Sequence, residues 1–329
     1  MNGPKYGGYI IGIDVGGTKT LFILQDRRGN TIYEETIPSV REIQVLKAFI
    51  DGSAARAGID LDAVSAMAIG VPGRVNPVDG IVIDAPGLGW KNLNLVKELF
   101  RYYPFPCAVE NDTTMALIAE AVIGKARQKS DFIFLAIGTG LGSAIMANGR
   151  IISGADYSAG EIGYCVFEDD IAPDFNNQTG KFGSLEKRLS GTGLDKIART
   201  QGTTTKDLFS SYRKDGSPGA SAVDAFILQL SATVANLVSI LNPQMVVIGG
   251  GVSESLERFL DDIADHVAHF TPIKTEIVIS GFYNRAGALG ACQRAKMILK
   301  DEEPSVPDKE KTAAGKEKTA AGEEKRYRT

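Results

Sequence analysis

The feature that most constrains the fold is a pattern of strands that occurs twice. Residues 9 to 36, "YIIGIDVGGTKTLFILQDRRGNTIYEET", contain apolar runs separated by a glycine-rich turn and by "DRRGN", which predicts three antiparallel strands. Residues 131 to 154, "DFIFLAIGTGLGSAIMANGRIISG", repeat this order. We expect a duplicated fold whose two α/β halves face each other across a cleft, although glycine-rich hairpins are common enough for chance likeness.

The remaining chain alternates between helical and extended patterns, which indicates an α/β layer fold. The predicted helices are residues 41–58, 94–103, 113–124, those near 193–241, one from Glu254, and a closing helix at about 286–299. The predicted strands are residues 64–71, 80–85, 106–111, 245–250 and 275–280. Residues 301–329, with the tandem "EKTAAGK" and "EKTAAGE", have almost no large apolar side chains, so we expect a disordered tail.

Composition excludes several classes of function. The net charge of −4 and the absence of a long Lys/Arg cluster argue against nucleic acid as a partner. No uninterrupted apolar run approaches the ~20 residues of a membrane span, and the N-terminus lacks a secretion signal, so we expect a cytoplasmic protein with no membrane partner. The scattered Cys107, Cys165 and Cys292 predict free thiols. His266 and His269 share a helix face. Because the sequence has no nucleophile motif, we do not expect either of them to act as the base of a Ser-His-Asp or Cys-His arrangement.

The first glycine-rich turn is a candidate phosphate site. "DVGGTKT" lacks the GxxxxGK[ST] pattern and precedes a strand, so it is neither a P-loop nor a dinucleotide fingerprint. Gly16, Gly17 and Thr18 can still present main-chain N–H groups to an anion, and Lys19 adds a cation. Asp14 suits either turn capping or a phosphate-bound Mg²⁺ held through water.

The second turn, "GTGLG" at residues 138–142, supplies Gly138, Thr139 and Gly140 as a facing set of donors. Two facing cradles suit a nucleotide triphosphate better than a monophosphate.

Three further segments place carboxylates near these turns. In "VENDTT", Asn111 and Asp112 follow a strand, where ligand groups gather in α/β sheets. Asp112 is either a helix N-cap or a general base that takes a proton from a hydroxyl. Glu161 and Glu186 lie on glycine-rich loops and are either polyol contacts or surface residues.

In combination, the ordered motifs of this chain resemble those of the ROK family of sugar kinases and sugar-responsive repressors. They are "GIDVGGTKT", "GVPGRV", "APGLGWKN", "ENDTTMALIAE", "AIGTGLGSAI", "GADYSAGEIGY", "LNPQMVVIGGGVSES" and "AGALGA". The resemblance implies a two-lobed actin/hexokinase-like (ribonuclease H-like) α/β fold with an ATP cleft. The expected lobes are residues 1–114 and 115–285, with residues 286–300 returning to the first lobe and 301–329 as the tail.

The resemblance also implies roles for individual residues in ATP- and Mg²⁺-dependent phosphorylation of a hexose or hexose derivative. Asp112 matches the catalytic base and a sugar contact, and Asp14 the residue that helps to hold Mg²⁺. The phosphate loops match Gly16, Gly17, Thr18 and Lys19, and Gly138, Thr139 and Gly140. The adenosine motif matches Gly249, Gly250 and Gly251, and the sugar contacts match Gly73, Asn111, Glu161 and Glu186.

This sequence departs from the family pattern in two places. Many members bind structural zinc through a histidine and three cysteines, whose positions here hold Tyr164, Asn177, Thr179 and Ser184. Since amide and hydroxyl groups are poor zinc ligands, we expect no zinc. Gly87 stands where glucose-phosphorylating relatives usually carry a sugar-contacting asparagine, so the identity of the sugar stays open.

Two alternatives to a kinase come from the same superfamily. A non-catalytic sugar-binding regulator would need a DNA-binding module, and only about eight residues precede the first strand, which we expect to be too few for a helix-turn-helix. An ATPase activator with an iron–sulfur cluster would need bridging cysteines. The family also commonly forms homodimers, but no stretch of this sequence identifies an interface.

Overall fold

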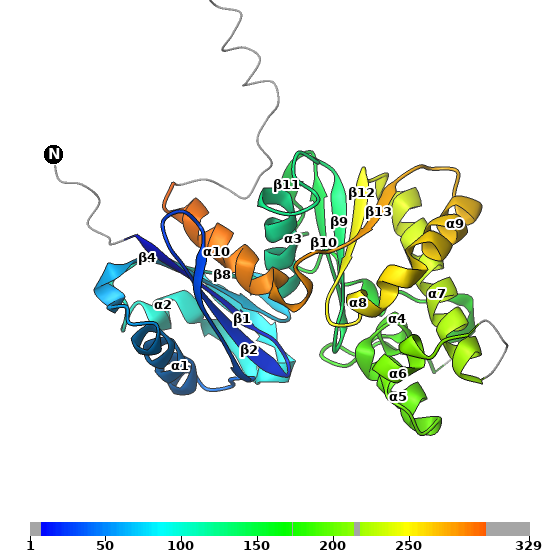
Figure 1. The fold of residues 1–329 in the computed structure, drawn as a ribbon, viewed down its shortest axis with the longest axis horizontal. Coiled ribbons are helices and arrows are strands. Elements are labelled where there is room, and N and C mark those ends of the chain that lie inside the picture. Colours follow the sequence, from blue (N-terminus) through cyan, green and yellow to red (C-terminus); the bar gives the residue numbers. More distant parts are fainter. Residues whose placement is uncertain (1–7, 173, 214–217, 301–329) are drawn as a thin grey trace, which may run out of the picture.

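The computed structural model describes residues 8–172, 174–213 and 218–300. Within them the chain forms two five-stranded sheets and one three-stranded sheet, with helices packed around and between the larger sheets (Figure 1). The predicted tail, residues 301–329, lies outside the described residues.

The first sheet has the strand order β3-β2-β1-β4-β8. Its strands are β1 (Tyr9–Val15), β2 (Lys19–Gln25), β3 (Thr31–Pro38), β4 (Val64–Val71) and β8 (Cys107–Asn111). β1 pairs antiparallel with β2 and parallel with β4. Every residue of β4 is buried, as expected from its unbroken apolar run, whereas β3 alternates in exposure as an edge strand does.

The second sheet repeats this arrangement, with the order β11-β10-β9-β12-β13. Its strands are β9 (Phe132–Ile137), β10 (Leu141–Ala147), β11 (Arg150–Ile151), β12 (Met245–Gly249) and β13 (Glu276–Ile279). β9 pairs antiparallel with β10 and parallel with β12, just as β1 does with β2 and β4. The duplicated pattern predicted from the sequence is therefore confirmed, and each glycine-rich turn joins the first two strands of its sheet.

Two strands were not predicted from the sequence. β5 (Arg74–Asn76), β6 (Ile81–Ala85) and β7 (Trp90–Asn94) form the small antiparallel sheet, of which only β6 was predicted. β5 is three residues long, and "WKNLN" of β7 exposes most of its polar side chains, so neither carries a clear alternation of apolar residues.

Most predicted helices occur to within a few residues, but α2 ends early, the helix predicted from Glu254 is divided into α8 and α9, and α4 was not predicted. The helices are α1 (Ile43–Arg56), α2 (Leu95–Leu99), α3 (Asp112–Val122), α4 (Ser184–Arg188), α5 (Gly191–Thr200), α6 (Thr205–Ser210), α7 (Pro218–Leu241), α8 (Ser253–Leu256), α9 (Leu260–Phe270) and α10 (Ala286–Ile298).

Two helices, α3 and α10, connect the two large sheets. One side of α3 packs with β1, β4 and α10 through Met115 and Ile118, and another side packs with β9 and β12 through Ala116 and Leu117. α10 crosses α3 closely, because a Cβ at Gly290 would lie 1.6 Å from the Met115 carbonyl oxygen. α3 thus lies between the two large sheets (Figure 1). The division at residue 114, which stays a proposal, falls within this helix.

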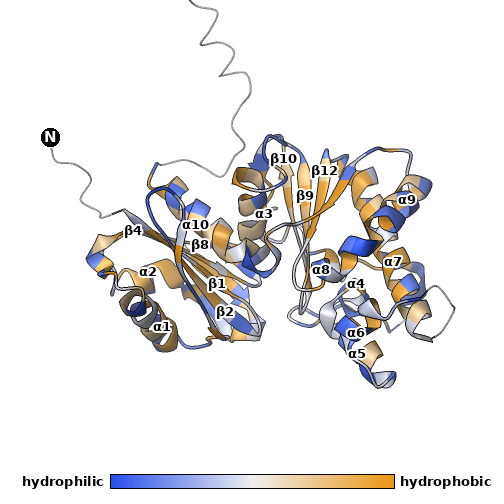
Figure 2. Ribbon diagram, in the orientation of Figure 1, coloured by the Kyte–Doolittle hydropathy of each residue, from blue (hydrophilic) through white to orange (hydrophobic). Residues whose placement is uncertain are grey.

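The outer faces of the sheets are covered by α1 on the first sheet and by α7 and α9 on the second. Figure 2 shows strongly apolar colouring along β9 and β12. Residues Gly219–Leu241 of α7 are long and apolar enough to cross a membrane by composition alone, but 56% of the most apolar window is buried inside the protein, as in a core helix.

Candidate active site

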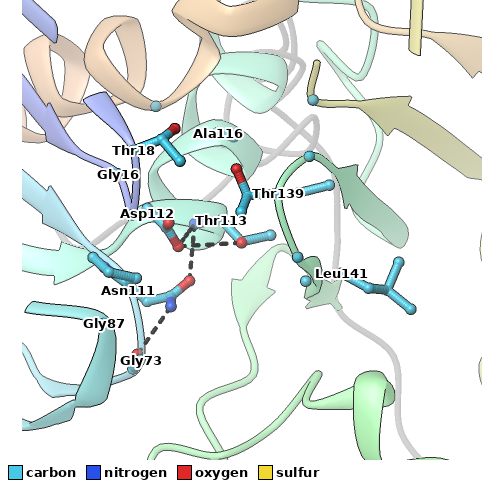
Figure 3. A pocket seen from close by; sticks show the side chains of 18 of the residues that line it. Gly16, Thr18, Gly73, Gly87, Asn111, Asp112, Thr113, Ala116, Thr139 and Leu141 are labelled. Carbon is cyan, nitrogen blue, oxygen red and sulfur yellow. Dashed lines mark hydrogen bonds between the residues drawn. The ribbon is translucent and has the colours of Figure 1, made fainter. Parts of the chain in front are cut away.

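A cavity of about 430 Å³ lies between the two sheets, beside the N-terminus of α3. Both glycine-rich turns line it, together with the end of β8 and two loops that follow β10. Figure 3 shows Asp112 between the turn that carries Gly16 and Thr18 and the turn that carries Thr139. The two halves of the duplicated fold therefore contribute to one site.

The first turn is held in shape from its outer side. The Gly16 N–H donates to the Lys19 carbonyl at 2.9 Å. The Ser39 hydroxyl donates to the Gly16 carbonyl at 2.6 Å, and the Ser39 N–H donates to that of Thr18 at 3.1 Å. A Cβ at Gly17 would meet no heavy atom within 4 Å. The turn is thus a fixed loop whose tip is open for a ligand to approach its backbone.

The second turn packs closely against its surroundings. The Gly138 N–H donates to the Gly140 carbonyl at 3.0 Å, and the Gly191 N–H donates to the Gly138 carbonyl at 2.7 Å. A Cβ at Gly140 would lie 2.3 Å from Glu186 Oε1. A side chain at residue 140 would therefore displace the carboxylate end of Glu186.

Asp14 has an unusual environment at the end of β1. The residue is half-buried, and its Oδ1 atom is fully buried without a hydrogen-bond partner. Burial, followed by the nearby charge of Asp112, raises the pKa of Asp14 to about 8, and Lys19 acts in the opposite direction. The start of α10 packs on this carboxylate, since a Cβ at Gly287 would lie 2.5 Å from Asp14 Oδ2. A buried carboxylate oxygen without a partner can accept a hard cation.

Asp112 is the first residue of α3, and the sequence alternative that it serves as the N-cap is wrong. Asn111 is the cap, because its Oδ1 accepts from the N–H groups of Thr113 and Thr114 at 2.9 and 3.0 Å. Asn111 Nδ2 also donates to the Gly73 carbonyl at 3.0 Å (Figure 3). Asn111 thereby fixes the turn that presents Asp112 to the cavity.

The Asp112 carboxylate is oriented by its neighbour Thr113, whose N–H donates to Oδ1 at 2.7 Å and whose hydroxyl donates at 3.3 Å. Burial raises the pKa of Asp112, and the Thr113 hydrogen bonds oppose that shift. A carboxylate with a raised pKa and a fixed orientation suits proton abstraction near neutral pH.

Glu161 and Glu186 form the opposite wall. Glu186 Oε1 accepts from the Leu141 N–H at 3.1 Å, just beyond the second turn. Burial raises the pKa of Glu161, and the charges of Glu186 and Asp112 add to this effect, which places the three carboxylates around one space. Burial also raises the pKa of Glu186. Such a ring of acceptors is suited to a ligand with several hydroxyl groups.

Almost all of the site residues predicted from the sequence line this cavity. They are Asp14, Gly16, Gly17, Thr18, Lys19, Gly73, Asn111, Asp112, Gly138, Thr139, Gly140, Glu161, Glu186, Gly250 and Gly251. Gly249 differs: it is a buried residue of β12, where a Cβ would lie 2.4 Å from the Phe134 ring, so its glycine serves packing rather than the cavity wall.

Sequence reasoning missed six lining residues with polar or aromatic side chains, of which Phe134 and Tyr283 are two. Thr113 follows the candidate base, and Asn284 precedes α10 near the quoted "AGALGA". Lys181 and Phe182 lie on the loop before α4. Thr113 lies inside the quoted "VENDTT", and Lys181 and Phe182 lie in the glycine-rich loop "GKFGSLE" that carries Glu186, so these three had a nearby signal in the sequence.

A scan against protein-family models matches the ROK family over residues 10–298. The chain belongs to the ROK family. Among curated relatives, a glucokinase of Halalkalibacterium halodurans is 28% identical over 86% of this chain and 93% of its own length. A β-glucoside kinase of Listeria monocytogenes is 31% identical over 69% of this chain and 78% of its own. A xylose repressor of Caldicellulosiruptor bescii is 29% identical over 86% of this chain and 77% of its own length.

The solved structures that match include a ROK family glucokinase of Streptomyces griseus in complex with glucose and AMPPNP. It has a TM-score of 0.75 and 24% identity, and the match covers 88% of this chain and all of the other. The predicted actin/hexokinase-like fold is therefore confirmed. The expectation of a carbohydrate kinase is confirmed at the level of enzyme class, since the ROK family relatives include several kinds of sugar kinase.

Proposed function

We propose that this chain catalyses the ATP- and Mg²⁺-dependent phosphorylation of a hexose or hexose derivative, with Asp112 as the general base. One observation carries the proposal: the oriented, half-buried Asp112 lies between two facing glycine-rich turns on one side and a wall of carboxylates on the other. Phosphoryl transfer requires mainly that donor and acceptor be held in line while charge is stabilised.

The turns and Lys19 are the proposed phosphate site, with main-chain N–H groups and one cation available to the phosphate oxygens. A second hollow adjoins this part of the cavity and is lined by Lys196, Arg199, Gly251 and Asn284 among others. We assign the remainder of the nucleotide to it, because it opens directly from Lys19 and Thr139, which line both spaces.

Asp14 is the proposed contact for Mg²⁺. The unpartnered, buried Oδ1 fits a hard cation, although the described residues hold no cluster of three His, Cys, Asp or Glu side chains. One or two carboxylates suffice for Mg²⁺ that also binds substrate phosphates and water. When bound, the ion would neutralise charge on the transferring phosphoryl group. Asp14 would hold it, through water or directly.

Asp112 would accept the proton of the attacking sugar hydroxyl. The Thr113 hydrogen bonds fix its carboxylate, so that the hydroxyl oxygen is aligned before transfer. Glu161 and Glu186 would accept hydrogen bonds from other hydroxyls of the ring, and Asn111 and the Gly73 backbone would complete the sugar site. These contacts orient the acceptor and exclude water from the attacking position.

The space beside the sugar site supports an acceptor other than plain glucose. A Cβ at Gly87 would meet no heavy atom within 4 Å, and Gly87 lines the cavity together with Tyr164 and Lys181. An acceptor that carries a substituent would fit in this opening.

We also propose that the loop before α4 needs no zinc. Asn177 Nδ2 donates to the Tyr164 carbonyl at 2.8 Å, and Asn177 Oδ1 accepts from the Ser184 N–H at 3.2 Å. These three residues occupy expected zinc-ligand positions, and they bond to one another instead.

The cytoplasmic location and the homodimer stay proposals, as does the absence of nucleic-acid and membrane partners.

A non-catalytic sugar-binding regulator is the second candidate, since a xylose repressor is among the relatives. The presence of Asp112 and of both glycine-rich turns favours catalysis.

Sugar-stimulated ADP release, measured at steady state over a panel of hexoses and hexose derivatives, decides between the two. We expect turnover with at least one sugar. Sugar binding by thermal shift without turnover on any sugar would favour the regulator.

A further inference from the structure

Glu186 lies on a helix that needs support from outside itself. α4 contains five residues, and its N-cap, Gly183, makes no side-chain capping bond. A helix this short has little stability of its own. Tertiary contacts must therefore fix the position of Glu186.

Asp170 makes those contacts at both ends of α4. Its Oδ1 accepts from the Ser184 hydroxyl at 2.5 Å and from Arg188 Nη2 at 2.5 Å. Its Oδ2 accepts from the Phe167 N–H at 2.9 Å, which fixes the carboxylate. The Asp170 side chain is 7% exposed and is not part of the cavity wall. One carboxylate outside the cavity thus bridges the first and last residues of the helix that carries Glu186.

Asn177 connects α4 to the segment that carries Glu161. That segment is the short helix η3 (Ile162–Tyr164), for which Glu161 is the N-cap residue. Asn177 bonds to the Tyr164 carbonyl and to the Ser184 N–H. The two backbones also lie in close contact, since a Cβ at Gly183 would lie 2.1 Å from the Gly163 carbonyl oxygen. Movement of α4 would accordingly disturb both carboxylates.

We propose that Asp170 and Asn177 are positioning residues that hold Glu186 and Glu161 in register for the acceptor sugar. The inference rests on the proposed function, in which these two glutamates contact the sugar. Neither residue touches the acceptor, and both act through α4 and η3.

The decisive variant is Asp170→Asn, which keeps the shape of the side chain and removes its charge. The matched control is Asp169→Asn: Asp169 lies 3.7 Å from Arg188 Nη1, but its side chain is 85% exposed, and exposed ion pairs contribute little. We expect Asp170→Asn to raise the sugar KM about tenfold or more, with the ATP KM within about twofold. Asn177→Ala should also raise the sugar KM. Asp170→Glu, which keeps the carboxylate, should raise the sugar KM less than Asp170→Asn does.

Hydrogen exchange of residues 177–188 in the full chain provides a readout that does not depend on activity. It should be faster in Asp170→Asn than in wild type and unchanged in Asp169→Asn. Unchanged exchange, an unchanged sugar KM, or equal rises in the sugar and ATP KM values would overturn the positioning role. Wild-type protein without sugar-dependent turnover would instead refute the proposed function, and the role in sugar positioning with it.

Discussion

Gly287→Ala tests whether the placement of Asp14 matters for activity. A Cβ at residue 287 would lie 2.5 Å from Asp14 Oδ2 and 2.7 Å from its Cγ. Ordinary contacts need about 3.5 Å, so the carboxylate or the start of α10 must move by about 1 Å. A displacement of about 1 Å among the groups that hold the reacting atoms lowers the reaction rate about 100-fold. We therefore expect kcat to fall by about two orders of magnitude.

The expected effect on stability is much smaller. Overpacking costs about 1–3 kcal/mol, and replacing glycine by alanine in a helix returns about 1 kcal/mol. The free energy of unfolding should thus fall by no more than about 2 kcal/mol. Denaturant unfolding and a coupled assay of ADP release measure the two effects separately.

Gly281→Ala is the matched control. Gly281 lies between β13 and α10, and a Cβ there would meet no heavy atom within 4 Å. It should keep wild-type kcat and stability. If Gly287→Ala retained kcat within about threefold, a 1 Å displacement would not matter, and the reasoning that places Asp14 in the reacting array would be refuted.

Three other predictions concern Mg²⁺, zinc and the acceptor. Since the pKa of the metal-free Asp14 is about 8, protons compete with Mg²⁺ for this carboxylate below that pH. The apparent Mg²⁺ affinity should therefore rise by up to about tenfold per pH unit from pH 6 to 8 and then level off. A flat dependence of the affinity on pH, measured by calorimetry, would contradict this. A zinc chelator should leave the Tm and the Mg²⁺-supported turnover unchanged, and one equivalent of zinc by elemental analysis of the purified protein would contradict the metal-free loop. Gly87→Asn should fold normally and lower kcat/KM for a substituted hexose by about tenfold relative to glucose, and an unchanged ratio would show that the opening does not select the acceptor.

The sequence predicted the parts of this fold whose signal is local. The strand, turn, strand pattern around Gly16 and Gly138 was sufficient to predict the first strands of both sheets, and the burial of β4 follows from its apolar run. Contacts between distant segments were not predictable in this way. β7 is polar and pairs only with β6 of the small sheet, and Asp170 reaches Ser184 and Arg188 through an irregular loop.

The sequence predicted which residues line the candidate site better than it predicted what each of them does. Asn111 was expected to contact sugar, and most of its side-chain bonding capacity serves the cap of α3 and the Gly73 carbonyl. Gly249 was assigned to the nucleotide, but it packs under Phe134. Side-chain partners depend on three-dimensional packing, which a motif does not specify.

Asp112→Asn provides the most direct test of the central proposal, because it removes the base and preserves the size of the side chain. The measurement pairs kcat with the sugar Kd from calorimetry on the same variant. We expect kcat to fall by about 100- to 10,000-fold, the range for loss of a general base, with the sugar Kd within about threefold of wild type. A variant that retains turnover within about tenfold of wild type would contradict the assignment of Asp112 as the base.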